Sequence, residues 1–214
     1  MLSTNYVALK RRYDVLVDQF EDIKNNRTPD VRHRMLHWRT LEGILSTAWQ
    51  SWCGFSRSTL MKSCFGTVTK SGTVVPPTLG ALSEGRVAYV AKCLTRSNPV
   101  KPGRVLQTFQ EPTWGDRQIV LEAARHFSLA NVSSLELGLL LTTRAADDMR
   151  IVRNATAHLS KEAMDKVQQL SPYYTGSSLR HPTDFMFWKD NSSGETSFIL
   201  WLSDLLDCAD LMVN

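Results

Sequence analysis

The residues best suited to chemistry lie in the segment Met149–Ser160, which reads MRIVRNATAHLS. His158 carries an imidazole whose ordinary pKa lies near neutrality, so it can accept or donate a proton during a reaction. Arg153 carries a planar guanidinium that is always charged and can hold two phosphate oxygens at once. The pair suits metal-free cleavage of a phosphodiester, with His158 as general acid or base and Arg153 stabilising the charge of the transition state.

The spacing of these residues limits how they can act together. On a regular helix of about 100° per residue, Arg153 and His158 point roughly 140° apart. Asn154 and His158 are four residues apart and share one face, so we predict that Asn154 orients the imidazole or holds a phosphate. Joint action of Arg153 and His158 requires an interrupted helix or a groove shared with a second copy. In either case both should line a cleft, while Ile151 and Val152 are buried.

The same segment has plainer interpretations. Arg153 can form an ion pair with Asp147 or Asp148, and His158 can simply end a helix, where cations are favoured. Asn154-Ala155-Thr156 also matches a glycosylation sequon, which has meaning only in a secreted protein. These interpretations compete with a catalytic role.

Metal and cofactor chemistry is not expected. His33 and His37 are four residues apart, as metal ligands on one helix face can be, but Arg32, Arg34 and Arg39 beside them would repel a cation. No glycine-rich phosphate loop, Rossmann glycine pattern or Gly-x-Ser-x-Gly elbow occurs. The cysteines lack the close pairing of zinc ligands, and we expect them to be buried apolar residues. They are Cys53, Cys64, Cys93 and Cys208.

Composition is typical of a soluble globular protein. The 214 residues, 43% hydrophobic and 21% charged, are enough to bury a sizeable core. No apolar run approaches the roughly 20 residues that span a bilayer, and the N-terminus becomes charged too early for a signal peptide. We therefore predict a cytoplasmic protein with no membrane association.

The formal net charge of +4 is unevenly distributed. Residues 182–214 carry a net charge of −5, so residues 1–181 carry +9. A basic body suits a polyanionic partner such as RNA, although a solvated surface is the commoner reason for such a bias.

The elements that must position the candidate residues are mostly helices. Apolar residues at spacings of three and four predict helices over about residues 5–24 and from residue 30 to residue 55 or beyond, the second started by Thr28-Pro29-Asp30. Asp116 is expected to cap a helix through about Phe127, and Ser133 or Ser134 to start another. The helix of the candidate residues is expected to run through Gln169. A last amphipathic helix is predicted from Phe198, Leu202, Leu205, Ala209 and Met212.

The middle of the chain is less regular. Residues 67–75 can form a small β-hairpin around Ser71-Gly72, and Thr78 is expected to cap a helix to about Leu94. Residues 97–115 contain three prolines and are predicted to form a loop. We predict one all-α domain over residues 1–214, a helical bundle with an irregular insert at about 66–115.

The segment IVRNATAH, late in a small all-α chain, resembles the apolar-apolar-Arg-Asn-x-x-Ala-His form of the Arg-x4-His motif of HEPN ribonucleases. Leu41–Phe55, which reads LEGILSTAWQSWCGF, is similar to the aliphatic and aromatic helix that precedes this motif in prokaryotic members. The resemblance covers most of residues 30–213 and is weakest over 66–115. It implies a HEPN-like bundle that forms a homodimer, with two motifs facing each other across a composite cleft.

On this resemblance we expect a metal-independent endoribonuclease that acts on single-stranded RNA or tRNA by attack of the 2′-hydroxyl. Arg153, Asn154 and His158 are its expected catalytic residues, and Arg150 and Lys161 are weaker candidates for RNA contacts. The family also implies a toxin–antitoxin or anti-phage defence setting, with an antitoxin or another defence protein as partner.

Two other functions stay open at this point. One is a non-catalytic HEPN-like module that binds RNA or a protein through the same cleft. The other is an unrelated helical adaptor in which the motif occurs by chance. Tyr173 and Tyr174 can likewise stack on a base or form a packed turn.

Overall fold

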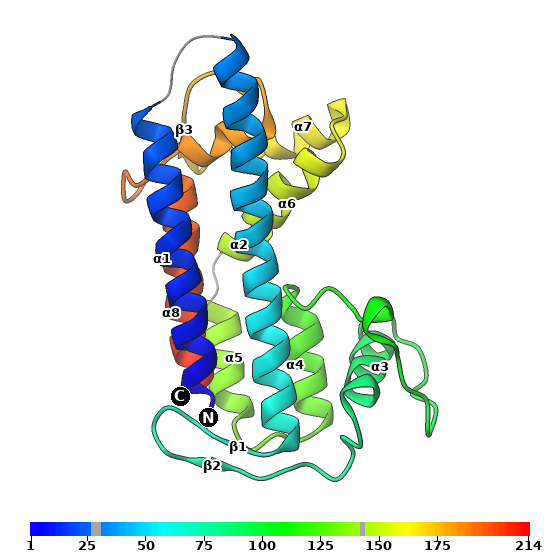
Figure 1. The fold of residues 1–214 in the computed structure, drawn as a ribbon. Coiled ribbons are helices and arrows are strands. Elements are labelled where there is room, and N and C mark those ends of the chain that lie inside the picture. Colours follow the sequence, from blue (N-terminus) through cyan, green and yellow to red (C-terminus); the bar gives the residue numbers. More distant parts are fainter. Residues whose placement is uncertain (27–30, 142–143) are drawn as a thin grey trace. The chain divides into compact units, whose positions relative to one another are not determined.

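The computed structural model of the chain describes residues 1–26, 31–141 and 144–214. Within these residues the fold is all-α, as the sequence predicts, and its strands form two short antiparallel pairs (Figure 1). None of the described helices combines the length and apolar content needed to cross a membrane. The predicted helix start at Thr28-Pro29-Asp30 and the side chain of His33 lie outside the described residues.

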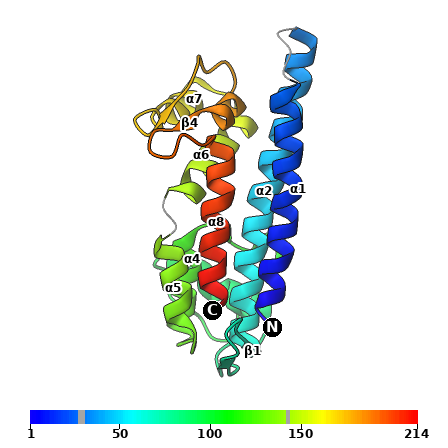
Figure 2. The ribbon, with the colours of Figure 1, turned by 90° about the vertical axis from the view of Figure 1, so that its left-hand side faces the viewer.

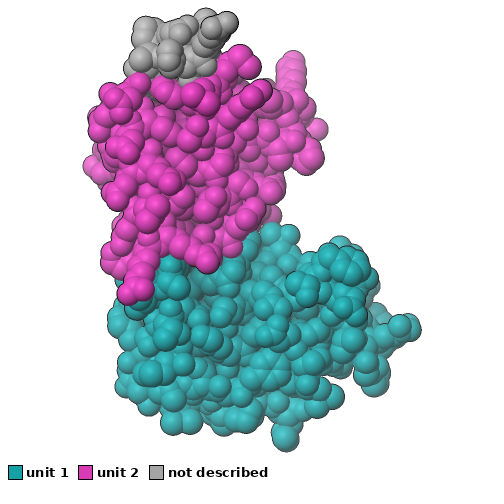
Figure 3. All heavy atoms as spheres, viewed as in Figure 1, with its two compact units in different colours: residues 1–9, 52–142, 206–214 teal, residues 10–51, 143–205 magenta. Residues whose placement is uncertain are grey.

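The chain divides into two compact units (Figure 3). Unit 1 comprises residues 1–9, 52–142 and 206–214, and unit 2 comprises residues 10–51 and 143–205. Three long helices contribute residues to both units: α1 (Ser3–Asn25), α2 (Val31–Phe65) and α8 (Ser197–Val213). The candidate residues belong to unit 2, and the irregular insert belongs to unit 1.

Unit 1 contains α3 (Glu84–Thr95), α4 (Arg117–His126) and α5 (Val132–Leu141). The helix α4 packs against both α3 and α5. As predicted, residues after α2 form a hairpin in which β1 (Thr67–Val68) pairs with β2 (Val74–Val75). Asp116 caps α4 as expected, because its carboxylate accepts a hydrogen bond from the Gln118 amide. The core of this unit includes Trp52, Leu60, Leu135 and Leu139.

The expected cap at Thr78 is wrong. The helix α3 begins at Glu84, and its cap is Ser83, whose hydroxyl accepts a hydrogen bond from the Arg86 amide. Thr78 instead donates to the carbonyl of Phe127. Gly80 disfavours an earlier start, whereas Ser83 followed by an acid satisfies the first turn of a helix. The predicted loop after α3 holds one 3₁₀ turn, η1 (Thr108–Gln110).

Unit 2 contains α6 (Ala145–Ala157), α7 (Lys161–Gln168) and the 3₁₀ helix η2 (Pro182–Phe187), which contacts both. Here β3 (Tyr174–Thr175) pairs with β4 (Lys189–Asp190). Within this unit α1 and α2 lie side by side (Figures 1 and 2), and the Tyr13 hydroxyl donates to the Ala48 carbonyl. Phe20 and Phe198 pack with ring centroids 5.0 Å apart.

The C-terminal amphipathic helix is confirmed. All five residues of its predicted apolar stripe are buried in α8. By contrast, the single helix expected to extend to Gln169 is interrupted, because α6 ends at Ala157 and α7 begins at Lys161. Ser160 causes the second start by capping α7, and its hydroxyl accepts a hydrogen bond from the Ala163 amide at 3.1 Å.

Candidate functional site

The candidate residues lie on the exposed side of α6. Its buried side is formed by Ala145, Asp148, Met149, Val152 and Ala155. Arg150 and Arg153 are partly exposed, while Asn154 and His158 are exposed. At about 100° per residue these four side chains fall within an arc of about 140°, with Arg153 and His158 at its two edges. The five-residue spacing therefore spans the exposed face of the helix.

Arg153 and Asn154 are in direct contact on this face. The Arg153 guanidinium donates to the amide oxygen of Asn154 at 3.2 Å, and the Arg153 carbonyl accepts from the Thr156 hydroxyl at 2.7 Å. Because Asn154 lies between Arg153 and His158 in angle around the helix, the hydrogen bond directs the guanidinium toward the middle of the exposed face.

His158 stands where α6 ends. Its backbone is no longer helical (φ −136°, ψ 71°), yet its amide still donates to the Asn154 carbonyl at 3.1 Å. The plainer interpretation, that His158 ends a helix, is therefore correct as a description of its position. The side chain remains exposed, so the same position leaves the imidazole accessible to a ligand.

The acids that could have neutralised Arg153 have other partners. Asp147 forms an ion pair with Arg150 at 2.9 Å. Asp148 is buried and receives the hydroxyl of Tyr174 at 2.8 Å. Within the described part of the chain, the side-chain hydrogen bond of Arg153 is therefore the one to Asn154.

The expected burial around the motif is met in part. Val152 is 0% exposed, while Ile151 is only partly buried. Neither Arg153 nor His158 lies in the core, and their placement in a cleft stays a prediction. Of the two weaker RNA candidates, Arg150 shares its charge with Asp147, and Lys161 is exposed at the first residue of α7.

A buried polar network lies on the other side of α6. The Tyr174 hydroxyl donates to Asp148 and accepts from the Trp201 indole at 2.9 Å. The guanidinium of Arg144 lies 3.8 Å from Asp148 and 3.3 Å from the centre of the Tyr173 ring. Burial raises the pKa of Asp148 and of Tyr174 above their usual values. Tyr174 is thus a packed residue, and of the two tyrosines only Tyr173 is half exposed.

The sequence analysis did not single out this network. One signal was available, because Asp148 occurs at helical spacing with Ala145, Val152 and Ala155, all of which are buried. Its partner Tyr174 lies 26 residues further along the chain, and no local pattern identifies that contact.

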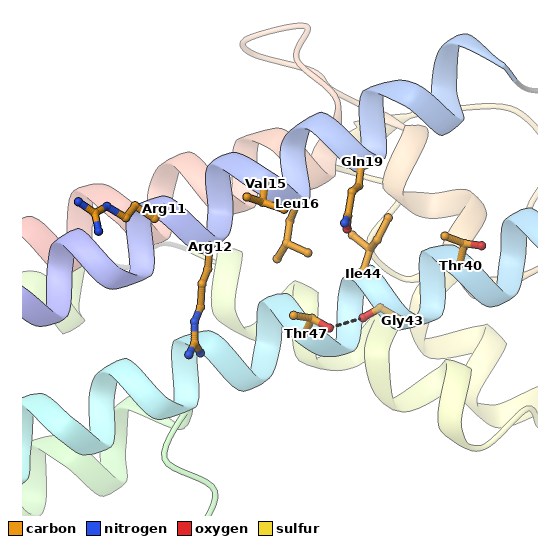
Figure 4. Close-up of a pocket in the computed structure, with 9 residues that line it drawn as sticks. All are labelled: Arg11, Arg12, Val15, Leu16, Gln19, Thr40, Gly43, Ile44 and Thr47. Carbon is orange, nitrogen blue, oxygen red and sulfur yellow. Dashed lines mark hydrogen bonds between the residues drawn. The ribbon is translucent and has the colours of Figure 1, made fainter.

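Two concave sites lie elsewhere. A groove between α1 and α2 in unit 2 is lined by residues of those two helices only (Figure 4). A smaller cavity in unit 1 is lined by Pro76–Leu79 and Phe127–Ala130. None of the candidate residues lines either one.

Within the described residues, no group of three or more His, Cys, Asp or Glu side chains is arranged to hold a metal ion. All four cysteines are free; Cys64, Cys93 and Cys208 are buried, and Cys53 is partly exposed. Burial raises the pKa of the Cys64 thiol to about 12, which makes this thiol unreactive near neutral pH.

Comparison of the chain with protein-family models, curated proteins and solved structures yields no match. A functional proposal must therefore rest on the residues themselves, above all on the exposed face of α6.

Proposed function

We propose that the protein is a metal-independent endoribonuclease whose working surface is the exposed face of α6. The observation that supports this function is the gathering of Arg153, Asn154 and His158 on that face, with the Arg153 guanidinium held by Asn154. A cation that can bind phosphate and an imidazole that can transfer a proton are the two groups that metal-free RNA cleavage needs. The resemblance of IVRNATAH to the HEPN motif points in the same direction.

The proposed reaction uses the 2′-hydroxyl of RNA as the nucleophile. Its oxygen bonds to the adjacent phosphorus as its proton passes to a base, and the bond from phosphorus to the 5′-oxygen breaks as that oxygen gains a proton. The products are a 2′,3′-cyclic phosphate and a 5′-hydroxyl. His158 acts in one of the two proton transfers, and Arg153 binds the non-bridging oxygens as negative charge accumulates.

A second copy would complete the site. One imidazole cannot be both the base and the acid of a single concerted step, so two His158 side chains facing each other across a composite cleft would share the two roles. This is the homodimer that the HEPN resemblance implies, with Arg150 and Lys161 as basic residues at its rim. By the same analogy, the setting is cytoplasmic toxin–antitoxin or anti-phage defence, with an antitoxin or another defence protein as partner.

The test is cleavage of single-stranded RNA and tRNA by purified protein in the presence of EDTA. His158→Ala should lower the cleavage rate by about 10²–10⁴-fold, the usual contribution of a positioned acid or base. His126→Ala is the matched control, because His126 is an exposed histidine in the last turn of α4. Cleavage fragments should carry 2′,3′-cyclic phosphate ends.

Two outcomes would replace this function with another. Cleavage that persists in pure His158→Ala protein would refute the catalytic role of His158. Binding of RNA without cleavage, weakened by Arg153→Ala, would instead support the non-catalytic module.

A further inference from the structure

A groove of about 640 Å³ runs between α1 and α2 in unit 2 (Figure 4). Leu16 and Ile44 lie between the two helices and are buried, whereas Val15 on α1 is 54% exposed. The side formed by α2 carries only small or short side chains, Thr40, Gly43 and Thr47. Exposed apolar surface of this kind on a helix pair marks a place where another element can pack.

The spacing of the lining residues suits a helix as the occupant. On α1 the residues are Arg11, Val15 and Gln19, at intervals of four, and on α2 they recur at intervals of three and four. Two turns of each helix are involved, a length of about 12 Å on α1. Rows at these intervals are the ridges that interlock when helices pack. No atom lies within 4 Å of the position that a Cβ on Gly43 would occupy, so a third helix can approach α2 closely.

The charges of α1 specify which helix. Residues 10–12 read Lys-Arg-Arg, and the acids Asp14, Asp18, Glu21 and Asp22 follow. Lys10 pairs with Asp14, and Lys24 pairs with Glu21. Within the described residues, the side chains of Arg11, Arg12, Asp18 and Asp22 form no hydrogen bond or ion pair. The exposed side of α1 therefore has two unpaired cations before Val15 and two unpaired anions after it.

We propose that the groove binds α1 of a second copy of this chain, in antiparallel orientation about a two-fold axis at Val15. Residues at equal distances on either side of Val15 then face each other, so Arg12 lies opposite Asp18 of the other copy. Arg11 lies opposite Gln19 and within one turn of Asp18 and Asp22. A parallel arrangement would place like charges together, whereas the antiparallel one pairs every unpaired charge with its opposite.

The resulting interface is closed and self-complementary. Each α1 fills the groove of the other copy, and the two α1–α2 pairs form a four-helix arrangement, the usual geometry of an isologous dimer of helical hairpins. The helix α6 contributes no residue to this groove. The interface is therefore separate from the proposed composite cleft and holds whether or not the protein cleaves RNA.

Charge reversal tests the pairing directly. The mass of the full chain is measured by light scattering after size-exclusion chromatography across a range of concentrations. Arg12→Asp and Asp18→Arg should each weaken association by roughly tenfold and halve the mass near the dissociation constant, because two symmetric ion pairs become two repulsions. The double variant Arg12→Asp/Asp18→Arg restores opposite charges and should recover the wild-type mass. Circular dichroism verifies that each variant is folded.

A matched pair of glycine variants tests the groove itself. Gly43→Leu places a bulky side chain where the second α1 would lie, and it should halve the mass. Gly54→Leu makes the same change on the same helix, also where a Cβ meets nothing within 4 Å, but outside the groove, and it should leave the mass unchanged. A wild-type monomer, equal masses for the two glycine variants, or a double charge variant that stays dissociated would overturn the proposal.

Discussion

The guanidinium of Arg153 is joined to the side chain of the next residue, Asn154, by a hydrogen bond of 3.2 Å. Neighbouring residues on a helix point about 100° apart, so this contact requires the arginine to bend across the exposed face of α6. It places a cation beside the residue that precedes His158 by one turn. Asn154 thus has a positioning role toward Arg153, in addition to the role toward His158 expected from the i, i+4 spacing.

Replacing Asn154 should impair RNA cleavage without affecting the fold. Asn154→Ala removes the acceptor that holds Arg153, and the cleavage rate should fall by up to about tenfold, the value of one hydrogen bond of about 1 kcal/mol. Single-turnover cleavage of a labelled RNA measures this rate. Asn26→Ala, another exposed asparagine at the end of a helix, is the control. A wild-type rate for Asn154→Ala would show that Arg153 needs no such positioning.

Tyr174→Phe should destabilise the protein. The change removes the donor to buried Asp148 and the acceptor of the Trp201 indole, leaving two buried polar groups without partners. The free energy of unfolding should fall by about 1–3 kcal/mol, measured by urea denaturation near pH 7. Tyr89→Phe is the comparison, because the Tyr89 hydroxyl accepts a longer bond, from the Lys101 amide at 3.3 Å, at a more exposed position. Equal losses in the two variants would contradict a special cost at Tyr174.

The helices were predictable wherever one apolar stripe is continuous. In α1 the stripe containing Leu9, Tyr13 and Phe20 is buried as its spacing predicts. Met35 occupies the corresponding stripe of α2 but is 51% exposed. Periodicity reports which residues share a face, whereas burial also requires another element to cover that face. That requirement is a tertiary property, which the spacing does not contain.

The candidate site was predictable in its residues and less so in its contacts. The sequence places Arg153, Asn154 and His158 on one helix, and their exposure follows from its amphipathic pattern. The hydrogen bond from Arg153 to Asn154 depends on a rotamer choice, and the engagement of Asp148 by Tyr174 depends on a contact across 26 residues. Such contacts are set by three-dimensional packing, so single-sequence patterns do not reveal them.

Gly138→Ala should be destabilising although alanine favours helices. A Cβ on Gly138 would lie 2.5 Å from Cγ of Met212 and 2.6 Å from the Cys208 carbonyl oxygen, so α5 and α8 could not keep their close approach. Overpacking of this kind costs about 1–3 kcal/mol, more than the roughly 1 kcal/mol gained in helix propensity. Gly54→Ala, where a Cβ has open space, should stabilise the protein. Urea denaturation of both variants checks the opposite signs, and a stabilised Gly138→Ala variant would refute the close contact.

The stability of the protein should decrease as the pH falls below 6.5 because of His181. This ring is 7% exposed, lies 3.1 Å from Glu42 and 2.8 Å from the Thr183 hydroxyl, and stacks on Trp38. Burial lowers its pKa below the ordinary value of 6.5, although Glu42 and Asp184 act in the opposite direction. The unfolded chain therefore binds a proton at a pH where the folded chain does not. The contribution of His181 is complete above 6.5 and is lost as the pH falls through the folded pKa.

His181→Gln tests this assignment, because glutamine can form hydrogen bonds but does not titrate. Wild-type protein should lose unfolding free energy between pH 7 and pH 5.5, at about 1.4 kcal/mol for each unit by which the pKa is lowered. The variant should be less stable at pH 7 but should show a smaller loss over the same interval. His126→Gln, at an exposed histidine, should retain the wild-type pH dependence. If His181→Gln retains it as well, another group must carry the loss, since the neutral ring of His181 would then contribute nothing to the pH response.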